Sequence, residues 1–222
     1  MLLNHTKRIQ WNEIGNLQDL GSGAYGTVKR GVFQGHDVAV KQVHSAELLS
    51  LSRPQAFALF LQECWAMNFL QHPKIIALVG VCFQPMSMVL EYMELGDLRK
   101  FLDSHNDLPW PLRVSLLSDI AEGMTYAHGQ WPPMIHKDLK SPNVFLTRSS
   151  NGRVVAKVAD LGLAEVLPQS SKVQGVDNPI WAAIEIIQGG VCTEKVDVWS
   201  FAIMVREIVV VVVVVFFLKK NT

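Results

Sequence analysis

Glycines divide the first part of the chain into short β-rich runs, and this pattern limits the available folds more than any other feature. They lie at positions 15, 21, 23, 26, 31 and 35, so residues 9–43 are predicted to form strands. From residue 97 the apolar spacing becomes helical, which predicts an α+β protein with two lobes joined near Met93–Asp97. The remaining expected elements are a helix at 54–71, strands at 75–83 and 86–92, helices at 97–103, 111–128 and 194–208, and a loop-rich stretch at 129–193.

Length, charge and cysteine usage exclude several classes of protein. The 222 residues suffice for one large domain or two modest lobes. Lys+Arg and Asp+Glu both total 20, so the neutral chain has no electrostatic reason to bind nucleic acid or an anionic membrane. Cys64, Cys82 and Cys192 form no CxxC pair and no zinc-ligand spacing, and residues 1–10 lack the apolar run of a signal peptide. A cytoplasmic protein with reduced thiols is therefore expected.

The segment Gly21-Ser22-Gly23-Ala24-Tyr25-Gly26-Thr27-Val28 carries a GxGxxG pattern. Alone, this pattern fits a tight glycine turn, a phosphate-binding loop or the opening of a dinucleotide fold. A dinucleotide fold needs a helix directly after the loop, whereas residues 27–33 alternate like a strand. A β-hairpin that covers phosphates is therefore favoured, because glycines let backbone N–H groups approach phosphate oxygens closely.

A lysine and a glutamate follow this hairpin. Lys41 closes the apolar strand Val38-Ala39-Val40, fifteen residues after Gly26, where it is placed to reach back to bound phosphates. A buried ammonium needs an anionic partner, and Glu63 on the predicted helix can supply one. Each residue also has a plain structural interpretation, as a strand end and as an exposed helix glutamate.

Two polar segments in the second half have the composition of a phosphoryl-transfer site. In His136-Lys137-Asp138-Leu139-Lys140-Ser141-Pro142-Asn143, a carboxylate, an ammonium and an amide oxygen lie within six residues. Asp138 can accept a hydroxyl proton, Lys140 can neutralise a phosphoryl group, and Asn143 offers an oxygen ligand suited to Mg²⁺. Asp160 ends the apolar strand 156–159 before Gly162, and its carboxylate can hold Mg²⁺. The alternative is a loop rich in turn-forming residues.

Taken in order, these elements resemble the signature set of protein kinases. Asn143 lies five residues after Asp138, and Asp160 lies seventeen after Asn143, as in that family. Within it, residues 132–146 are similar to Roco-type kinases of the tyrosine-kinase-like group. The resemblance implies a two-lobed kinase-like fold: a β-rich N-lobe with one helix, glycine-rich loop and hinge at 10–93, and an incomplete α-rich C-lobe at 94–208.

The resemblance also implies a function and its residues. ATP would donate its γ-phosphoryl group, with Mg²⁺, to a protein hydroxyl; Lys140, two residues after the catalytic aspartate, favours serine or threonine as the acceptor. The catalytic residues would be Asp138, Lys140, Lys41 and Glu63, and the metal ligands Asn143 and Asp160. Nucleotide would be bound by Leu20, Gly21, Ser22, Gly23, Ala24, Tyr25, Gly26, Thr27, Val28, Ala39, Lys41, Leu90, Glu91, Met93 and Phe145.

Residues 163–180 would be the activation loop, in which an upstream kinase could phosphorylate Ser170 or Ser171. The sequence departs from the family pattern nearby. Lys137 replaces an arginine that grips the phosphorylated loop bidentately, and lysine grips less specifically. Leu161 replaces a phenylalanine, Asn178 a frequent threonine, and Ala183-Ile184-Glu185 lacks the usual proline.

The end of the chain is atypical. Val209–Val215 are seven consecutive valines within the apolar run Ile208–Leu218, which is too short for a membrane helix of about 20 residues. A β-branched, uncharged run predicts a buried or aggregation-prone strand in a valine-rich tail at 209–222. Since the resemblance stops near Ile208, the C-lobe is interpreted as truncated, leaving Glu185 without its usual arginine and the chain unstable. The alternative function is accordingly a nucleotide-binding pseudokinase or scaffold module.

Overall fold

The computed structural model describes residues 6–23, 26–43, 52–105, 107–161, 164–166 and 179–219. The chain forms two compact units. The first comprises Met1–Gln71 and Ile76–Met93, and the second comprises His72–Ile75 and Glu94–Thr222. Strands predominate in the first unit and helices in the second, so the predicted α+β class is confirmed.

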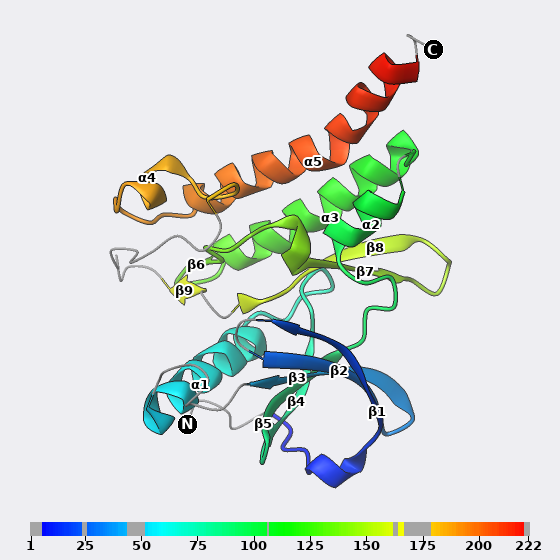
Figure 1. Cartoon of the computed structure of the whole chain (residues 1–222). Helices are drawn as coiled ribbons and strands as arrows, with labels where there is room; N and C mark the ends of the chain where they lie inside the picture. The colour runs from blue at the N-terminus through cyan, green and yellow to red at the C-terminus, as the bar shows by residue number, and fades with distance from the viewer. Residues whose placement is uncertain are drawn as a thin grey trace. The chain divides into compact units, whose positions relative to one another are not determined.

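The first unit is built on an antiparallel five-stranded sheet with the order β1-β2-β3-β5-β4 (Figure 1). Val38 and Val40 of β3 and Val89 of β5 belong to one buried apolar cluster. Valine is β-branched and therefore packs well in a sheet. The strands are β1 (Ile14–Gly23), β2 (Gly26–Phe33), β3 (His36–Val43), β4 (Leu78–Phe83) and β5 (Met86–Glu91), preceded by the 3-10 helix η1 (Trp11–Glu13).

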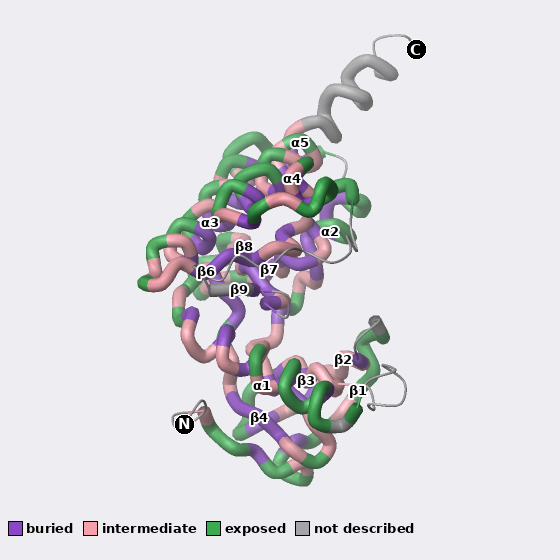
Figure 2. Tube along the Cα trace, turned by 90° about the vertical axis from the view of Figure 1, so that its left-hand side faces the viewer, coloured by how far each residue is buried: buried purple, intermediate pink, exposed green. Residues whose placement is uncertain are grey.

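The helix of the first unit, α1 (Arg53–Phe69), begins with a capping box. The Ser52 hydroxyl accepts the Gln55 N–H, and the Gln55 side chain accepts the Ser52 N–H, so two backbone donors of the first turn are satisfied. Buried positions along the helix are interspersed with exposed and half-buried ones (Figure 2). Four of its buried apolar residues recur every three or four positions, namely Ala56, Phe60, Cys64 and Met67, and Ala66 is buried as well. The helix predicted at 54–71 is thus present, ending two residues earlier.

The second unit is organised around α3 and α5, which lie side by side (Figure 1). Leu116 and Ile120 of α3 share one buried cluster with Met204 and Ile208 of α5. Asp97 caps α2, accepting the Lys100 N–H at 2.9 Å. The helices are α2 (Leu98–Ser104), α3 (Trp110–His128), α4 (Ile184–Ile187) and α5 (Lys195–Lys219).

The stretch predicted to be loop-rich contains more regular structure than expected. Two small antiparallel sheets lie in it, β6 with β9 and β7 with β8, and both hold polar segments between apolar strands. Apart from the strand predicted at 156–159, these strands are too short to give a periodic signal in the sequence, so the sequence predicts mainly loop for residues 129–193. They are β6 (Met134–Ile135), β7 (Val144–Arg148), β8 (Val154–Val158) and β9 (Glu165–Val166), with the 3-10 helix η2 (Ser141–Asn143) before β7.

The strand predicted for the valine run is wrong, because α5 continues through Val209–Val215 to Lys219. Extending an existing helix adds a hydrogen bond for each residue fixed, whereas a new strand needs a partner strand. Helical continuation therefore outweighs the β preference of valine, which depends on packing context. No helix in the described part of the chain is both long enough and apolar enough to cross a membrane.

Candidate active site

The glycine-rich segment lies where β1 and β2 pair. Gly21 is opposite Val28, and Gly23 is opposite Gly26; Ala24 and Tyr25 lie outside the described residues. A Cβ on Gly26 would come within 2.3 Å of the backbone oxygen of Gln42, so close packing on β3 requires glycine there. A Cβ on Gly21 would meet nothing within 4 Å, so protein packing does not explain that glycine.

The ion pair expected between strand and helix is present in the first unit. Lys41 Nζ of β3 lies 2.7 Å from Glu63 Oε1 of α1. The two side chains are only 20% and 12% exposed, so the pair is shielded from water and the lysine ammonium is held in a defined position. Burial raises the pKa of the neighbouring Cys64 thiol to about 12, and the Glu63 carboxylate adds to this rise.

Three of the predicted nucleotide-binding residues, Ala39, Leu90 and Glu91, lie on the paired strands β3 and β5. Leu90 is opposite Ala39, and Glu91, the last residue of β5, is opposite Val38. Glu91 is fixed twice to Ala77: its N–H donates to the Ala77 carbonyl at 3.1 Å, and its Oε1 accepts the Ala77 N–H at 2.7 Å. These bonds hold the start of the segment that leads to the buried Met93.

In the second unit, Asp138 is the centre of a polar cluster. Its Oδ2 accepts from Lys140 Nζ at 2.6 Å and from Asn143 Nδ2 at 3.0 Å. Asn143 Nδ2 also donates to the Asp138 carbonyl at 2.9 Å. The side chains of Asp138 and Lys140 are 17% and 14% exposed. A carboxylate, an ammonium and an amide are thus held together by partners only two and five residues apart.

Asp197, at the start of α5, anchors this loop from a distance. Its side chain is 1% exposed and accepts the N–H groups of His136 at 2.8 Å and Lys137 at 2.9 Å. His128 Nε2 lies 2.8 Å from the same carboxylate. Since Asp197 bonds to the backbone just before Asp138, it fixes where the loop enters the cluster.

His136 connects the loop to β8. The Asp138 N–H donates to His136 Nδ1 at 3.3 Å, and His136 Nε2 lies 2.9 Å from the Ala159 carbonyl. Both contacts are satisfied together when the ring hydrogen is on Nε2, which donates to Ala159. The buried histidine thereby ties Asp138 to the residue before Asp160.

Asp160 adopts a left-handed backbone conformation with φ of 62°. A non-glycine residue occupies this region at a cost, and such residues concentrate at functional sites. Its predecessor is fixed, because the Ala159 N–H donates to the Asn143 carbonyl at 2.9 Å. The two predicted metal ligands therefore belong to segments that are hydrogen-bonded to each other.

Asn143 and Asp160 fit the chemistry of a magnesium site. Both side-chain hydrogen bonds of Asn143 to Asp138 use Nδ2, so its Oδ1 can serve as a metal ligand, and Asp160 adds a carboxylate. In the described part of the chain, no three His, Cys, Asp or Glu side chains gather as a metal site. Mg²⁺ at phosphate-transfer sites is held by one or two protein groups together with substrate phosphates, so a small protein ligand set is what this ion requires.

Comparison with known proteins decides the family. A family model described as protein tyrosine and serine/threonine kinase matches residues 14–213. The chain belongs to the protein kinase family. Its α+β architecture, with a five-stranded antiparallel sheet in the first unit, agrees with this assignment.

Several named kinases are similar to this one. The probable serine/threonine-protein kinase pats1 of Dictyostelium discoideum is 37% identical over 200 residues, covering 86% of this chain, and roco5 of the same organism is 34% identical, covering 90%. The serine/threonine-protein kinase CTR1 of Arabidopsis thaliana is 32% identical and also covers 90%. The predicted resemblance to Roco-type kinases is confirmed. The matched regions span 6%, 7% and 24% of these relatives' lengths.

The remaining predicted kinase residues are placed as follows. Leu20, Ser22, Thr27 and Val28 lie on β1 and β2, and Phe145 lies on β7. Ser170, Ser171 and Asn178 lie outside the described residues. Glu185, predicted to lack its arginine, makes no ion pair with any residue that the structure describes. Lys137, which replaces the usual arginine, has a left-handed backbone with φ of 68°.

Sequence reasoning missed the residues that hold the site from afar. The sequence predicted only a helix at 194–208 around Asp197, and it gave no role to Asp197 or His128. Trp181 was missed too: its Nε1 donates to Glu207 at 3.2 Å, and its carbonyl accepts from Ser200 at 2.8 Å, so Trp181 is bonded twice to α5. The available signal was chemical, since an aspartate and a glutamate inside an apolar helix need donors.

Proposed function

We propose that this chain is a protein kinase that transfers the γ-phosphoryl group of ATP, with Mg²⁺, to serine and threonine hydroxyls of proteins. The observation that carries the proposal is the Asp138 cluster, in which a half-buried carboxylate, an ammonium and an amide meet within 3.0 Å. Membership of the kinase family and the serine/threonine kinase names of the relatives support it.

The proposed reaction is an in-line displacement. The substrate hydroxyl oxygen bonds to the γ-phosphorus, the bond from that phosphorus to the β,γ-bridging oxygen breaks, and ADP leaves. Asp138 orients the hydroxyl and accepts its proton, while Lys140 neutralises charge on the transferred group. Asn143 and Asp160 would hold Mg²⁺, which supplies further charge neutralisation when bound.

The first unit would bind the nucleotide. Lys41, oriented by Glu63, holds the α and β phosphates, and backbone N–H groups of residues 21–28 cover them. Backbone groups of Glu91 and Met93 bond to adenine, and Val28 and Ala39 contact its faces. The space at Gly21 supports this arrangement, since no atom of the described residues lies within 4 Å of a Cβ placed there.

Regulation and location are part of the proposal. An upstream kinase acts on Ser170 or Ser171, and replacing both by alanine should then lower activity; unchanged activity would contradict this. Lysine at position 137 makes such control weaker than arginine would. Buried reduced Cys64 and Cys82 support a reducing compartment, and we place the protein in the cytoplasm.

The test is transfer of labelled phosphate from ATP–Mg²⁺ to a serine- and threonine-containing protein and to the chain itself, with Asp138→Asn as the matched control. The proposal expects transfer by the parent chain and its loss in the variant. Thermal stabilisation by ATP–Mg²⁺ without transfer would overturn the proposed catalysis and leave a nucleotide-binding protein.

A further inference from the structure

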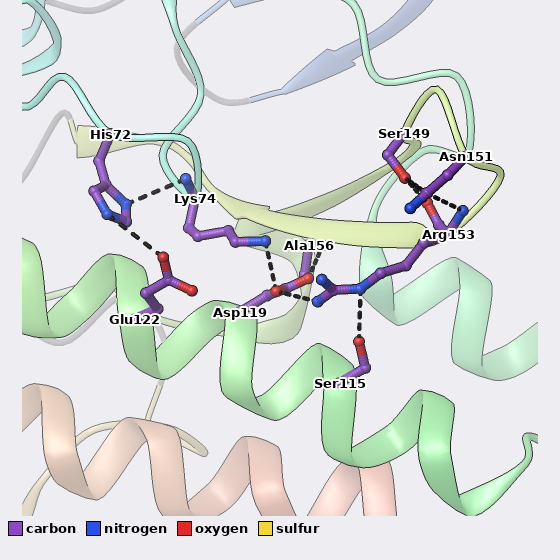
Figure 3. A network of polar contacts seen from close by, with 9 residues as sticks. All are labelled: His72, Lys74, Ser115, Asp119, Glu122, Ser149, Asn151, Arg153 and Ala156. Atoms are coloured by element: carbon purple, nitrogen blue, oxygen red, sulfur yellow. Dashed lines mark hydrogen bonds and ion pairs between the residues drawn. The ribbon is translucent and has the colours of Figure 1, made fainter.

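Another buried aspartate of the second unit, Asp119, organises a polar network of its own (Figure 3). Asp119 of α3 has a side chain only 2% exposed. Its Oδ1 lies 2.6 Å from Lys74 Nζ and 2.6 Å from Arg153 Nη2, and its Oδ2 accepts the Ala156 N–H at 3.1 Å. We call Lys74, Asp119, Arg153 and Ala156 the Asp119 network. One buried carboxylate therefore holds two cations and one backbone donor.

The Asp119 network supplies hydrogen-bond acceptors to the N–H groups of β8 that point away from β7. Successive N–H groups of a strand point to opposite sides, and Ala156 and Val158 share the side not paired with β7. Asp119 accepts the Ala156 N–H, and the Lys74 carbonyl accepts the Val158 N–H at 2.8 Å. Ile75 forms a parallel bridge with Val158. β8 ends two residues before Asp160, so these bonds determine where its chain arrives.

The face of α3 is shaped to receive His72–Ile75. A Cβ on Gly123 would lie 2.8 Å from the Lys74 carbonyl oxygen, so glycine is required where that oxygen also serves β8. One turn further, Tyr126 stacks on His72 with ring centroids 4.6 Å apart. Asp119, Gly123 and Tyr126 follow the spacing of one helix face. This packing is independent of the charges and points to the same contact.

We infer that Asp119 is a positioning residue for phosphoryl transfer: through β8 it sets the position of the metal-binding Asp160, and through Lys74 it fixes the segment after α1. The inference rests on the proposed function. Asp119 contacts neither Asp138 nor Asn143 among its described partners, so it acts only through other residues. Positioning groups of this kind change the affinity of a metal site without touching the metal.

The test uses Asp119→Asn, with Glu122→Gln as the matched control on the same helix. Both variants replace a carboxylate by its amide. The Glu122 side chain, however, is 53% exposed, and its one described ion-pair contact is a long one, 3.7 Å from Oε1 to His72 Nε2. An amide at position 119 would place a donor against Lys74 or Arg153. Amide hydrogen exchange of Ala156 and Val158, without nucleotide or metal, should quicken about tenfold or more in Asp119→Asn and stay at the parent rate in Glu122→Gln.

A second measurement separates positioning from general stability. The Mg²⁺ concentration for half-maximal phosphoryl transfer at saturating ATP should rise about tenfold in Asp119→Asn, measured well below its melting temperature. A purely structural residue would lower the melting temperature and leave this concentration unchanged. Lys74→Met keeps the backbone carbonyl and removes one cation, so it should give the same effects more weakly if Asp119→Asn does not fold.

Exchange at Ala156 and Val158 within twofold of the Glu122→Gln control in both Asp119→Asn and Lys74→Met would overturn the inference. So would quickened exchange with an unchanged Mg²⁺ requirement, since β8 would then not position Asp160. A parent chain that transfers no phosphate refutes the proposed function and, with it, the catalytic role of Asp119. The exchange data would still show whether Asp119 holds β8, so the two failures are distinguishable.

Discussion

The two units hold their charged residues in different ways. In the first unit, Lys41 and Glu63 are 22 residues apart and meet because α1 packs on the sheet. In the second, Asp138, Lys140 and Asn143 are sequence neighbours, and a tight turn already brings them together. The first pair therefore depends on tertiary packing, while the second cluster depends on one short segment and its anchors.

The two arrangements should respond differently to mutations elsewhere in the chain. A local cluster keeps its internal contacts after distant changes, but its orientation depends on outside groups, here the Asp197 carboxylate and the His136 ring. The long-range pair does not keep its contact in this way, since movement of α1 would separate the two side chains. Catalysis is more sensitive to orientation than folding is, because misplacement by about 1 Å can cost about 100-fold in rate.

The largest effect is expected at the centre of the local cluster. Asp138→Asn should lower kcat by about 10²–10⁴-fold, because the amide cannot accept the hydroxyl proton. The melting temperature should change little, since the variant keeps an oxygen to accept from Lys140. Steady-state kinetics with calorimetry checks both, and a variant that retains a tenth of the parent activity would remove Asp138 from its proposed role.

The anchor of that cluster should matter next. Asp197→Asn replaces one acceptor oxygen by a donor that faces the N–H groups of His136 and Lys137, at a cost of about 1–3 kcal/mol of unfolding free energy. We expect kcat to fall as well. Asp103→Asn, which disrupts an exposed pair with Arg99, should cost at most about 1 kcal/mol. Equal losses measured by urea denaturation would contradict the anchoring role.

The two members of the long-range pair, Lys41 and Glu63, should contribute unequally to activity. Lys41→Met removes a group proposed to contact phosphate and should lower activity by about 100-fold. Glu63→Gln leaves the ammonium in place, less well oriented, and should cost less. ATP titrations of both variants test this ranking, and the reverse order would mean that the carboxylate contributes more than orientation.

Two glycines of the hairpin should separate packing from nucleotide binding. Gly26→Ala forces a Cβ against the Gln42 backbone oxygen and should cost about 1–3 kcal/mol of stability. Gly21→Ala has room and should change stability by at most about 0.5 kcal/mol while weakening ATP binding. Melting curves with and without ATP–Mg²⁺ measure both effects; Gly21→Ala with parent affinity would argue against phosphate contact there.

The last prediction concerns the Cys64 thiol beside the long-range pair, which affects stability only at high pH. Its pKa is about 12 when folded, against an ordinary value of 9.0. The folded state therefore holds the proton more tightly, and this contribution to stability is complete below pH 9 and lost as pH rises from 9 to 12. Stability should fall by up to about 1.4 kcal/mol per pH unit in that window, less steeply in Cys64→Ala. The unfolding free energies of the parent and of Cys64→Ala are measured by denaturation at pH 8 and pH 10. An equal loss between these two pH values in both proteins would contradict the raised pKa.

Local pattern was enough to predict much of this fold. Glycine spacing identified β1–β3, apolar spacing identified α1 and α3, and the Asp138 segment was predicted from neighbouring residues. Asp197 and Asp119 could not be predicted, because their backbone partners lie 60 and 37 residues away and only the packed helices bring them together. The valine run was mispredicted because its β preference is local, whereas the helix it continues begins fourteen residues earlier at Lys195.

The most direct test of the account is phosphoryl transfer to three peptides that differ only in a serine, threonine or tyrosine at one position. The parent chain with ATP and Mg²⁺ should label the serine and threonine peptides, and Asp138→Asn should label none. Labelling of the tyrosine peptide alone, or equal labelling by parent and variant, would contradict the assignment of this site as a serine/threonine kinase centre.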